Sequence, residues 1–293
     1  MIDRILPIDI WENEICKFMS IKDIVNFSLC SKKCNNLSIE MLNNSRDQSI
    51  KFSYETYITN KHKIDSIKNI KKNIVLDIWK SGEYVLDCIN EDVNSLFITL
   101  YSKMDLIDFS KCKNIKELYI RSINLNEISI LGNFNFNRLE TLFMSNINIL
   151  GYDNNIFRNI KYLELENCIG LNNFESDIVF TSLETLCLRF MRVDSINNIK
   201  SLKNIELECV INTTLLYNLP NITYLKCVSC SLNNLENVTS LEVIHLNYCV
   251  NINNIECLYN LKTLYINRCS RIKSIKKLKK LENINICNWN GEI

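Results

Sequence analysis

Two cysteines in the second half of the chain have the spacing of a metal or redox motif. They form the run Cys227-Val-Ser-Cys230. Two thiolates at this spacing hold one side of a zinc ion, and a second pair of ligands must complete the tetrahedron. Cys249 is the nearest candidate, and no second pair stands at a similar spacing. The sequence therefore favours ordinary buried thiols here and predicts no metal and no cofactor.

Residues for catalysis are equally hard to assemble from this sequence. The chain has 2 histidines, His62 and His245, and 5 glycines. Neither histidine can be placed in a Ser-His-Asp arrangement at a workable spacing. The few glycines do not form a phosphate-binding loop. We therefore predict that the protein is not an enzyme.

The charge of the chain is nearly balanced. Its 293 residues carry a formal net charge of +1, with 47% hydrophobic and 23% charged residues. This is the composition of a folded chain, and it gives no general reason to expect nucleic acid or an acidic membrane as a partner. Residues 271–280 contain six Lys or Arg. We interpret that run as a solvated face, with an acidic partner or nucleic acid as the alternative.

No segment of the sequence predicts secretion or membrane insertion. Asp3, Arg4, Asp9 and Glu12 interrupt any apolar region of a signal peptide. No apolar run approaches the ~20 residues that span a bilayer. The 14 cysteines are therefore expected to be reduced thiols. We expect a cytoplasmic protein, with the nucleus as an alternative, and a secreted adhesin or receptor is disfavoured.

Most of the cysteines belong to an internal repeat. Leu241-Glu-Val-Ile-His-Leu-Asn-Tyr-Cys249 and Leu261-Lys-Thr-Leu-Tyr-Ile-Asn-Arg-Cys269 share apolar residues at positions 1, 4 and 6 and Cys at position 9. The pattern starts at residues 93, 115, 139, 160, 183, 202, 222, 241, 261 and 281, with a weaker start near Lys71. These intervals resemble leucine-rich repeats, which are about 20–29 residues long. The sequence predicts about 11 repeats over residues 71–293.

The repeat pattern predicts an α/β solenoid with a concave parallel β-sheet. Positions 4 and 6 are two residues apart, so both point to one face of a strand. One repeat cannot bury its apolar side alone, and neighbouring repeats must stack. Position 9 should then be a buried column, in which cysteines act as small apolar residues. The short C-terminal repeats should be extended or 3₁₀ on the convex side, and the longer repeats between residues 93 and 182 have room for a helical turn.

Positions 3, 5, 7 and 8 of each repeat should point out from the concave sheet. Aromatic residues and Arg are enriched at binding hot spots, although exposed aromatics can instead stabilise neighbouring strands. The middle repeats add a cluster of Glu residues around one Arg. The predicted partner-binding residues of this concave face are Phe97, Tyr119, Arg121, Phe143, Glu164, Glu166, Arg189, Glu206, Glu208, His245, Tyr248, Tyr265 and Arg268.

Residues 1–45 read as three short helices, too small a core to stand alone. Their motifs are Leu6-Pro7-Ile8-Asp9-Ile10, Lys22-Asp23-Ile24 and Leu29-Cys30-Ser31-Lys32-Lys33-Cys34. In order and spacing this segment resembles an F-box, a trihelical domain. Cys34 stands where that family usually has Trp. We expect three parts: an F-box-like segment at residues 1–45, a connector at 46–70 and the solenoid at 71–293.

The resemblance implies a partner and a function. F-box proteins dock on the Skp1 adaptor of cullin–RING ubiquitin ligases, and those with leucine-rich repeats hold a substrate on the repeats. The adaptor-facing residues implied by the resemblance are Leu6, Pro7, Ile10, Ile15, Asp23, Ile24 and Leu29. With the heavy use of Asn, Ile and Lys, the chain also resembles F-box and repeat proteins of protists and large DNA viruses. The alternative is a stand-alone repeat scaffold or inhibitor whose residues 1–45 only cap the first repeat.

Overall fold

A computed structural model describes the chain from residue 49 onward, with gaps. The described residues are 49–59, 61–62, 71–78, 82–85, 93–101, 104–109, 114–129, 138–150, 157–171, 173–175, 180–212 and 216–292. The trihelical segment predicted at residues 1–45 lies outside them. No helix in these ranges is long and apolar enough to cross a membrane.

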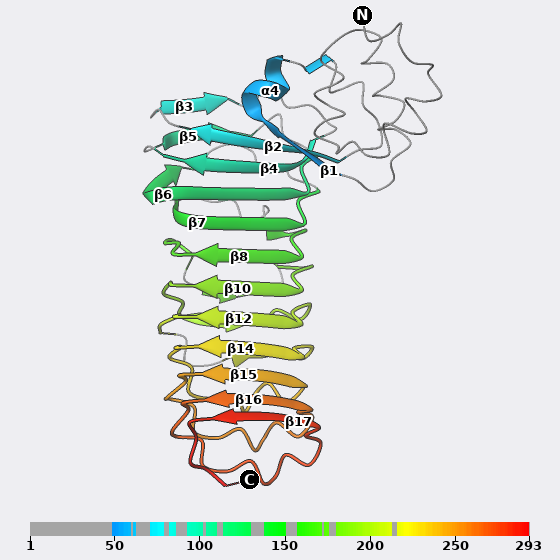
Figure 1. Ribbon diagram of the computed structural model, residues 1–293, viewed down its shortest axis with the longest axis vertical. Helices are drawn as coiled ribbons and strands as arrows, with labels where there is room; N and C mark the ends of the chain where they lie inside the picture. Colours follow the sequence, from blue (N-terminus) through cyan, green and yellow to red (C-terminus); the bar gives the residue numbers. More distant parts are fainter. Residues whose placement is uncertain are drawn as a thin grey trace, which may run out of the picture.

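Parallel strands stacked in sequence order form one long sheet (Figure 1). Each predicted repeat start leads into a strand, and the weaker start near Lys71 is β2, so the parallel solenoid is confirmed. The strands along this path are β1 (Ser49–Ser53), β2 (Lys71–Ile78), β4 (Val93–Leu100), β6 (Glu117–Ser129), β7 (Thr141–Leu150), β8 (Tyr162–Glu166), β10 (Thr185–Arg189), β12 (Asn204–Glu208), β14 (Tyr224–Val228), β15 (Val243–Asn247), β16 (Thr263–Asn267) and β17 (Asn283–Cys287).

The remaining elements are short. The strands β9 (Asn173–Glu175), β11 (Ser195–Asn197) and β13 (Leu216–Tyr217) form a second parallel sheet. Two others, β3 (Gly82–Val85) and β5 (Met104–Asp108), pair with each other, and β5 also pairs with β6. The helix α4 (Tyr54–Thr59) follows β1, so both lie within the predicted connector. Among the described residues between 93 and 182 there is no α-helix.

Tight turns close the convex side of the C-terminal repeats. The Leu258 N–H donates to the Ile255 carbonyl at 3.0 Å, and the Leu278 N–H donates to the Ile275 carbonyl at 3.0 Å. Hydrogen bonds between residues three apart are the 3₁₀ type. A repeat of 19–20 residues therefore returns without a regular helix, as its length predicts.

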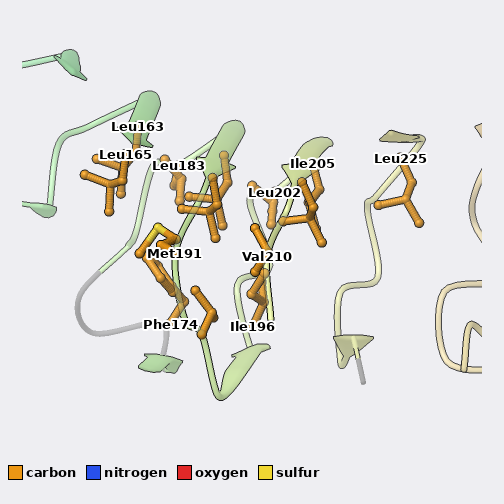
Figure 2. Close-up of a cluster of buried hydrophobic side chains, with 14 of the residues drawn as sticks. Leu163, Leu165, Phe174, Leu183, Met191, Ile196, Leu202, Ile205, Val210 and Leu225 are labelled. Carbon is orange, nitrogen blue, oxygen red and sulfur yellow. The ribbon is translucent and has the colours of Figure 1, made fainter. Parts of the chain in front are cut away.

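Apolar columns fill the space between the concave strands and the convex turns (Figure 2). Position 4 of successive repeats is Leu163, Leu186, Ile205 and Leu225, and each has 0% of its surface exposed. Positions 1, 6 and 9 add parallel columns of buried side chains. Truncating one such Leu to Ala removes contacts to two neighbouring repeats, and typically costs about 2–5 kcal/mol.

The cysteines at position 9 are buried, as predicted, and they also donate hydrogen bonds. The Cys230 thiol donates to the Val228 carbonyl at 3.2 Å, and the Cys269 thiol donates to the Asn267 carbonyl at 3.4 Å. Burial raises the pKa of Cys168 in the same column to about 11, so it stays a protonated donor. No group of metal ligands stands among the described residues.

Position 8 has a left-handed backbone in every repeat from the one that starts at residue 139 onward. The φ angle is 53° at Phe190, 55° at Tyr248 and 54° at Arg268. The same conformation occurs at Asn146, Asn167, Cys209, Ser229 and Asn288. Asn tolerates this region, whereas a bulky residue there costs about 1–2 kcal/mol. In the repeats whose strand ends at position 7, the chain turns at this point, and the stacking of neighbouring repeats holds Phe190, Tyr248 and Arg268 in place against that cost.

A pair of substitutions at Phe190 tests this strain. We expect Phe190→Gly to be more stable than Phe190→Ala by about 1 kcal/mol, because only Ala retains the left-handed penalty. The free energy of unfolding in urea measures the difference. At Thr185, an extended residue of β10, the matched pair should show the reverse order, with Gly less stable than Ala. If the Gly and Ala variants rank in the same order of stability at both positions, the backbone of Phe190 is not strained.

Candidate binding face on the concave sheet

The register of the sheet turns outward positions into straight columns. Phe97 pairs with Tyr119, Tyr119 with Phe143, and Phe143 with Glu164. The column continues through position 5 of every later strand to Asn285. Position 7 forms a parallel column two residues along. The sequence pattern predicted both columns, and the register confirms them.

An aromatic ladder covers the first part of this face. The rings of Phe97 and Tyr119 stack with centroids 4.4 Å apart and planes inclined by 6°. The Phe143 ring follows at 6.2 Å from Tyr119, tilted by 34°. Burial, and then the charge of Glu117, raises the pKa of Tyr119, which keeps its hydroxyl protonated. Arg121 is exposed in the neighbouring column, so a cation borders the flat apolar surface.

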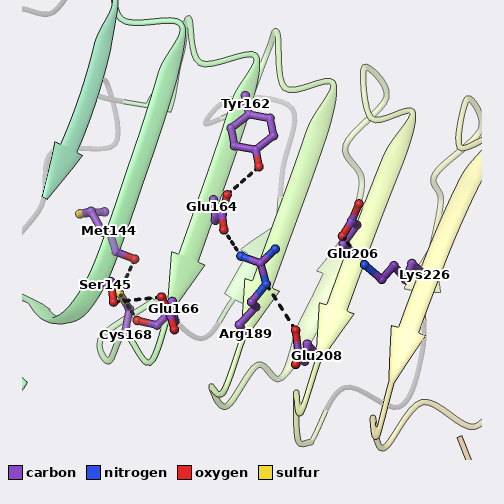
Figure 3. A network of polar contacts seen from close by, with 10 residues as sticks. All are labelled: Met144, Ser145, Tyr162, Glu164, Glu166, Cys168, Arg189, Glu206, Glu208 and Lys226. Carbon is purple, nitrogen blue, oxygen red and sulfur yellow. Dashed lines mark hydrogen bonds and ion pairs between the residues drawn. The ribbon is translucent and has the colours of Figure 1, made fainter. Parts of the chain in front are cut away.

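Arg189 is the centre of a charged network in the middle of the face (Figure 3). Its guanidinium pairs with Glu164 and lies 3.5 Å from Glu208, from Nε to Oε2. The Tyr162 hydroxyl donates to Glu164 at 2.6 Å. Burial, and then a hydrogen bond with Cys187, raises the pKa of Tyr162, so this donor remains neutral. Two carboxylates of the predicted acidic cluster, Glu164 and Glu208, are thus drawn together around one cation.

Lys226 is a second cation that the predicted site did not include. Its ammonium lies 3.1 Å from Glu206, from Nζ to Oε2. Lys226 stands next to Glu206 in the position 5 column. The two residues occupy position 5 of consecutive repeats, and this spacing could have predicted their ion pair from the sequence. Glu166 accepts a hydrogen bond from the Ser145 hydroxyl at 3.1 Å and forms no ion pair with a described residue. Four carboxylates and two cations therefore leave this region with a net charge of about −2.

His245 lies between two aromatic rings in the last part of the face. Its ring centroid is 5.7 Å from that of Tyr224 and 5.7 Å from that of Tyr265. Burial, and then the positive charge of Lys226, lowers the pKa of His245 below its ordinary 6.5. The imidazole is therefore neutral at pH 7, and the three rings form a second aromatic surface.

Tyr248 and Arg268 lie at the edge of the sheet, one residue past their strands. The Arg268 guanidinium stands over the Tyr248 ring, 5.0 Å from its centroid, and donates to the Tyr248 hydroxyl. Phe190 occupies the same position of an earlier repeat and is 49% exposed. The three side chains therefore extend the candidate face onto its rim, and Phe190 was not among the predicted residues.

A shallow cavity of about 400 Å³ lies at the opposite end of the strands. Lys116, Arg138, Glu140 and Lys161 are among its lining residues. Lys161 and Glu140 pair at 3.0 Å, and Lys262 pairs with Glu242 in the same column at 2.9 Å. These exposed pairs stabilise little. The cavity has paired charges and no aromatic surface, so the concave face remains the candidate site.

Comparison with known protein families identifies the segment that precedes β1. Residues 5–44 match the F-box domain. The resemblance predicted at residues 1–45 is thereby confirmed, and F-box domains generally bind Skp1 in cullin–RING ligases. The predicted adaptor-facing residues lie within the F-box segment and outside the described residues, so their contacts stay a prediction.

Two further comparisons concern the whole chain. An internalin from Listeria monocytogenes is similar in structure, with 15% sequence identity and a TM-score of 0.36. The match covers 98% of this chain and 92% of the internalin. No curated protein matches the sequence. The F-box match and the parallel solenoid together fit an F-box protein with leucine-rich repeats.

Replacing Arg189 with Met tests the network that organises the middle of the face. The variant should lose about 1–2 kcal/mol of unfolding free energy, because it leaves Glu164 half-buried without its cation; the more exposed Glu208 adds less. Urea unfolding measures the loss. Glu166→Gln is the control, since that carboxylate has no cationic partner among the described residues, and it should change stability by less than about 0.5 kcal/mol. Equal losses would contradict the assigned role.

Proposed function

We propose that this protein is the substrate-recruiting F-box subunit of an SCF-type ubiquitin ligase. In this proposal residues 5–44 dock on Skp1, and the concave sheet binds the target protein. The observation that carries it is the combination of an F-box match with a solenoid that presents two aromatic surfaces on one face.

Such a subunit does no chemistry of its own. It holds the target near the ubiquitin-carrying enzyme and so raises the effective concentration of target there. The column of thiols suits this role, because buried, inaccessible cysteines are poor nucleophiles. We place the function in a reducing compartment, the cytoplasm or the nucleus.

The face favours a target with a defined pattern of side chains. From β7 to β14 the sheet takes four strand steps, or roughly 19 Å, and this separates Phe143 from Tyr224. The charged middle lies between them. A matching target presents apolar or planar groups at two points about this far apart, with basic groups between them, because buried like charges would oppose binding.

The alternative function is a stand-alone repeat scaffold or inhibitor. In that case residues 1–45 only cover the first repeat and bind no adaptor. The F-box match favours the ligase subunit, because a simple cap requires an apolar face but no F-box motif. Direct binding to Skp1 separates the two.

Purified Skp1 should bind the full chain in a pull-down. Leu6→Ala/Pro7→Ala should abolish this binding, because the resemblance places both residues at the adaptor. The thermal midpoint of the solenoid should stay unchanged. Tyr119→Ala, on the concave sheet, is the control and should retain Skp1. If the full chain fails to bind Skp1, or the double variant changes only stability, the protein is a scaffold rather than a ligase subunit.

Proximity labelling in cells tests the concave face. Tyr119→Ala/Phe143→Ala should lose labelled targets while Skp1 remains labelled, because each hot-spot residue contributes about 2 kcal/mol, or roughly 30-fold in affinity. Tyr259→Ala is the control, because Tyr259 is 61% exposed and lies outside the concave strands. A target list that is unchanged in the double variant, or lost equally in the control, would place binding elsewhere.

A further inference from the structure

The ion pair in the shallow cavity neutralises only one of the cations that line it. Among the described residues, three cations and one anion border this cavity of about 400 Å³, namely Lys116, Arg138, Lys161 and Glu140. Lys161 pairs with Glu140 at 3.0 Å, whereas Lys116 and Arg138 form no ion pair with a described residue. Three positive charges and one negative charge give this lining a formal net charge of +2. The cavity therefore attracts anions.

Lys116 lacks the carboxylate that the other lysines of its column have. Position 2 of successive repeats forms a column directly before the strands, in which lysine and glutamate alternate from residue 116 onward, apart from Thr223. Each later lysine reaches back to the glutamate of the preceding repeat, in the pairs Lys161–Glu140 at 3.0 Å, Lys203–Glu184 at 3.0 Å and Lys262–Glu242 at 2.9 Å. The residue that precedes Lys116 in this column is the neutral Asn94. The Lys116 ammonium therefore has no carboxylate one repeat back.

Arg138 departs from the structural role of its own column. The residue just before position 1 commonly ties its repeat to the preceding one. The Ser201 hydroxyl donates to the Leu183 carbonyl at 2.8 Å, and the Asn221 amide donates to the Lys200 carbonyl at 2.7 Å. Bonds to the preceding repeat are also made by Ser240 and Asn260. Arg138 is exposed at this place before β7 and makes no such bond with a described residue. The stacking of repeats therefore does not account for an arginine here.

We propose that this cavity binds a phosphate monoester. Such a group carries a charge of about −1.5 to −2 at pH 7, which matches the net charge of the lining. The Arg138 guanidinium can donate two parallel hydrogen bonds to phosphate oxygens, and the Lys116 ammonium supplies a point charge. The Ser182 hydroxyl and the Asn159 amide line the same cavity, and groups of both kinds can donate to phosphate oxygens. A single carboxylate would leave one positive charge without a partner.

The phosphate can come from a phosphorylated side chain of another protein or from a small phosphate compound. Both present the same charged group to the cavity. The volume of the cavity falls within the range of about 300–1,000 Å³ that is usual for small-molecule sites, so there is room for part of the group that carries the phosphate. None of the described lining residues belongs to the F-box segment or to the predicted concave set. The proposal therefore does not depend on the ligase function.

Calorimetric titration of the full chain with N-acetylphosphoserine amide tests the site. The wild type should bind this compound, and Arg138→Gln should weaken binding by at least about tenfold, because charge-assisted hydrogen bonds to the phosphate are lost. Arg271→Gln is the control. Arg271 is exposed, lies away from the cavity and forms no ion pair with a described residue, so this variant loses the same charge and should bind like the wild type. No binding by the wild type, or equal weakening in both variants, overturns the proposal.

A second titration separates the two sources of the phosphate. It uses peptides that contain one phosphoserine between random flanking residues, together with the same peptides without the phosphate. Tighter binding of the phosphopeptides than of N-acetylphosphoserine amide identifies a phosphorylated protein as the source, because flanking residues then add contacts. Equal affinity of the two identifies a small phosphate compound. If the unphosphorylated peptides bind as tightly as the phosphopeptides, the phosphate contributes nothing and the proposal is wrong.

Discussion

Every rung of this protein has an apolar side that it cannot bury alone. The positions at 1, 4, 6 and 9 face inward, and the columns through them are closed only by the rungs above and below. This need for neighbours fixes parallel strands, a constant interval and an in-line register. The thiols at position 9 fill one of these columns and also donate to a carbonyl two residues earlier in the chain.

The same register determines the chemistry of the outer face. Residues one repeat apart become neighbours across about 4.8 Å of sheet, so each column interacts with itself. Rings stack where aromatics follow one another, as at Phe97 and Tyr119. Carboxylates require a cation between them, and Arg189 and Lys226 meet that need. The candidate site is therefore partly a consequence of packing, and its ion pairs contribute to the stability of the sheet.

The sequence was sufficient to predict the structural features that follow from the regular interval between repeats. The strand starts, the inward columns and the order of side chains on the concave face all follow from one interval. Pairings that depend on side-chain reach did not follow, such as Tyr162 with Glu164 or Lys226 with Glu206. The left-handed turn at Phe190 was also unpredicted, because its residue type argues against that conformation. The F-box was predicted from a sequence motif. A segment of about forty residues without an internal repeat gives no spacing from which the positions of its side chains could be inferred.

The stacking of repeats also constrains inward and outward positions of the sequence differently. An inward position tolerates Leu, Ile, Met or Cys according to volume, and an outward position is constrained only by its two column neighbours. In the function that we propose, recognition therefore depends on the order of aromatic, charged and aromatic repeats along the stack. Inserting or deleting one complete repeat would preserve every inward contact and yet move the Phe143 surface relative to Tyr224 by one strand spacing, about 4.8 Å. If the concave face binds the target as we propose, the number of repeats between the two aromatic surfaces is a specificity element in its own right, independent of the residues that line them.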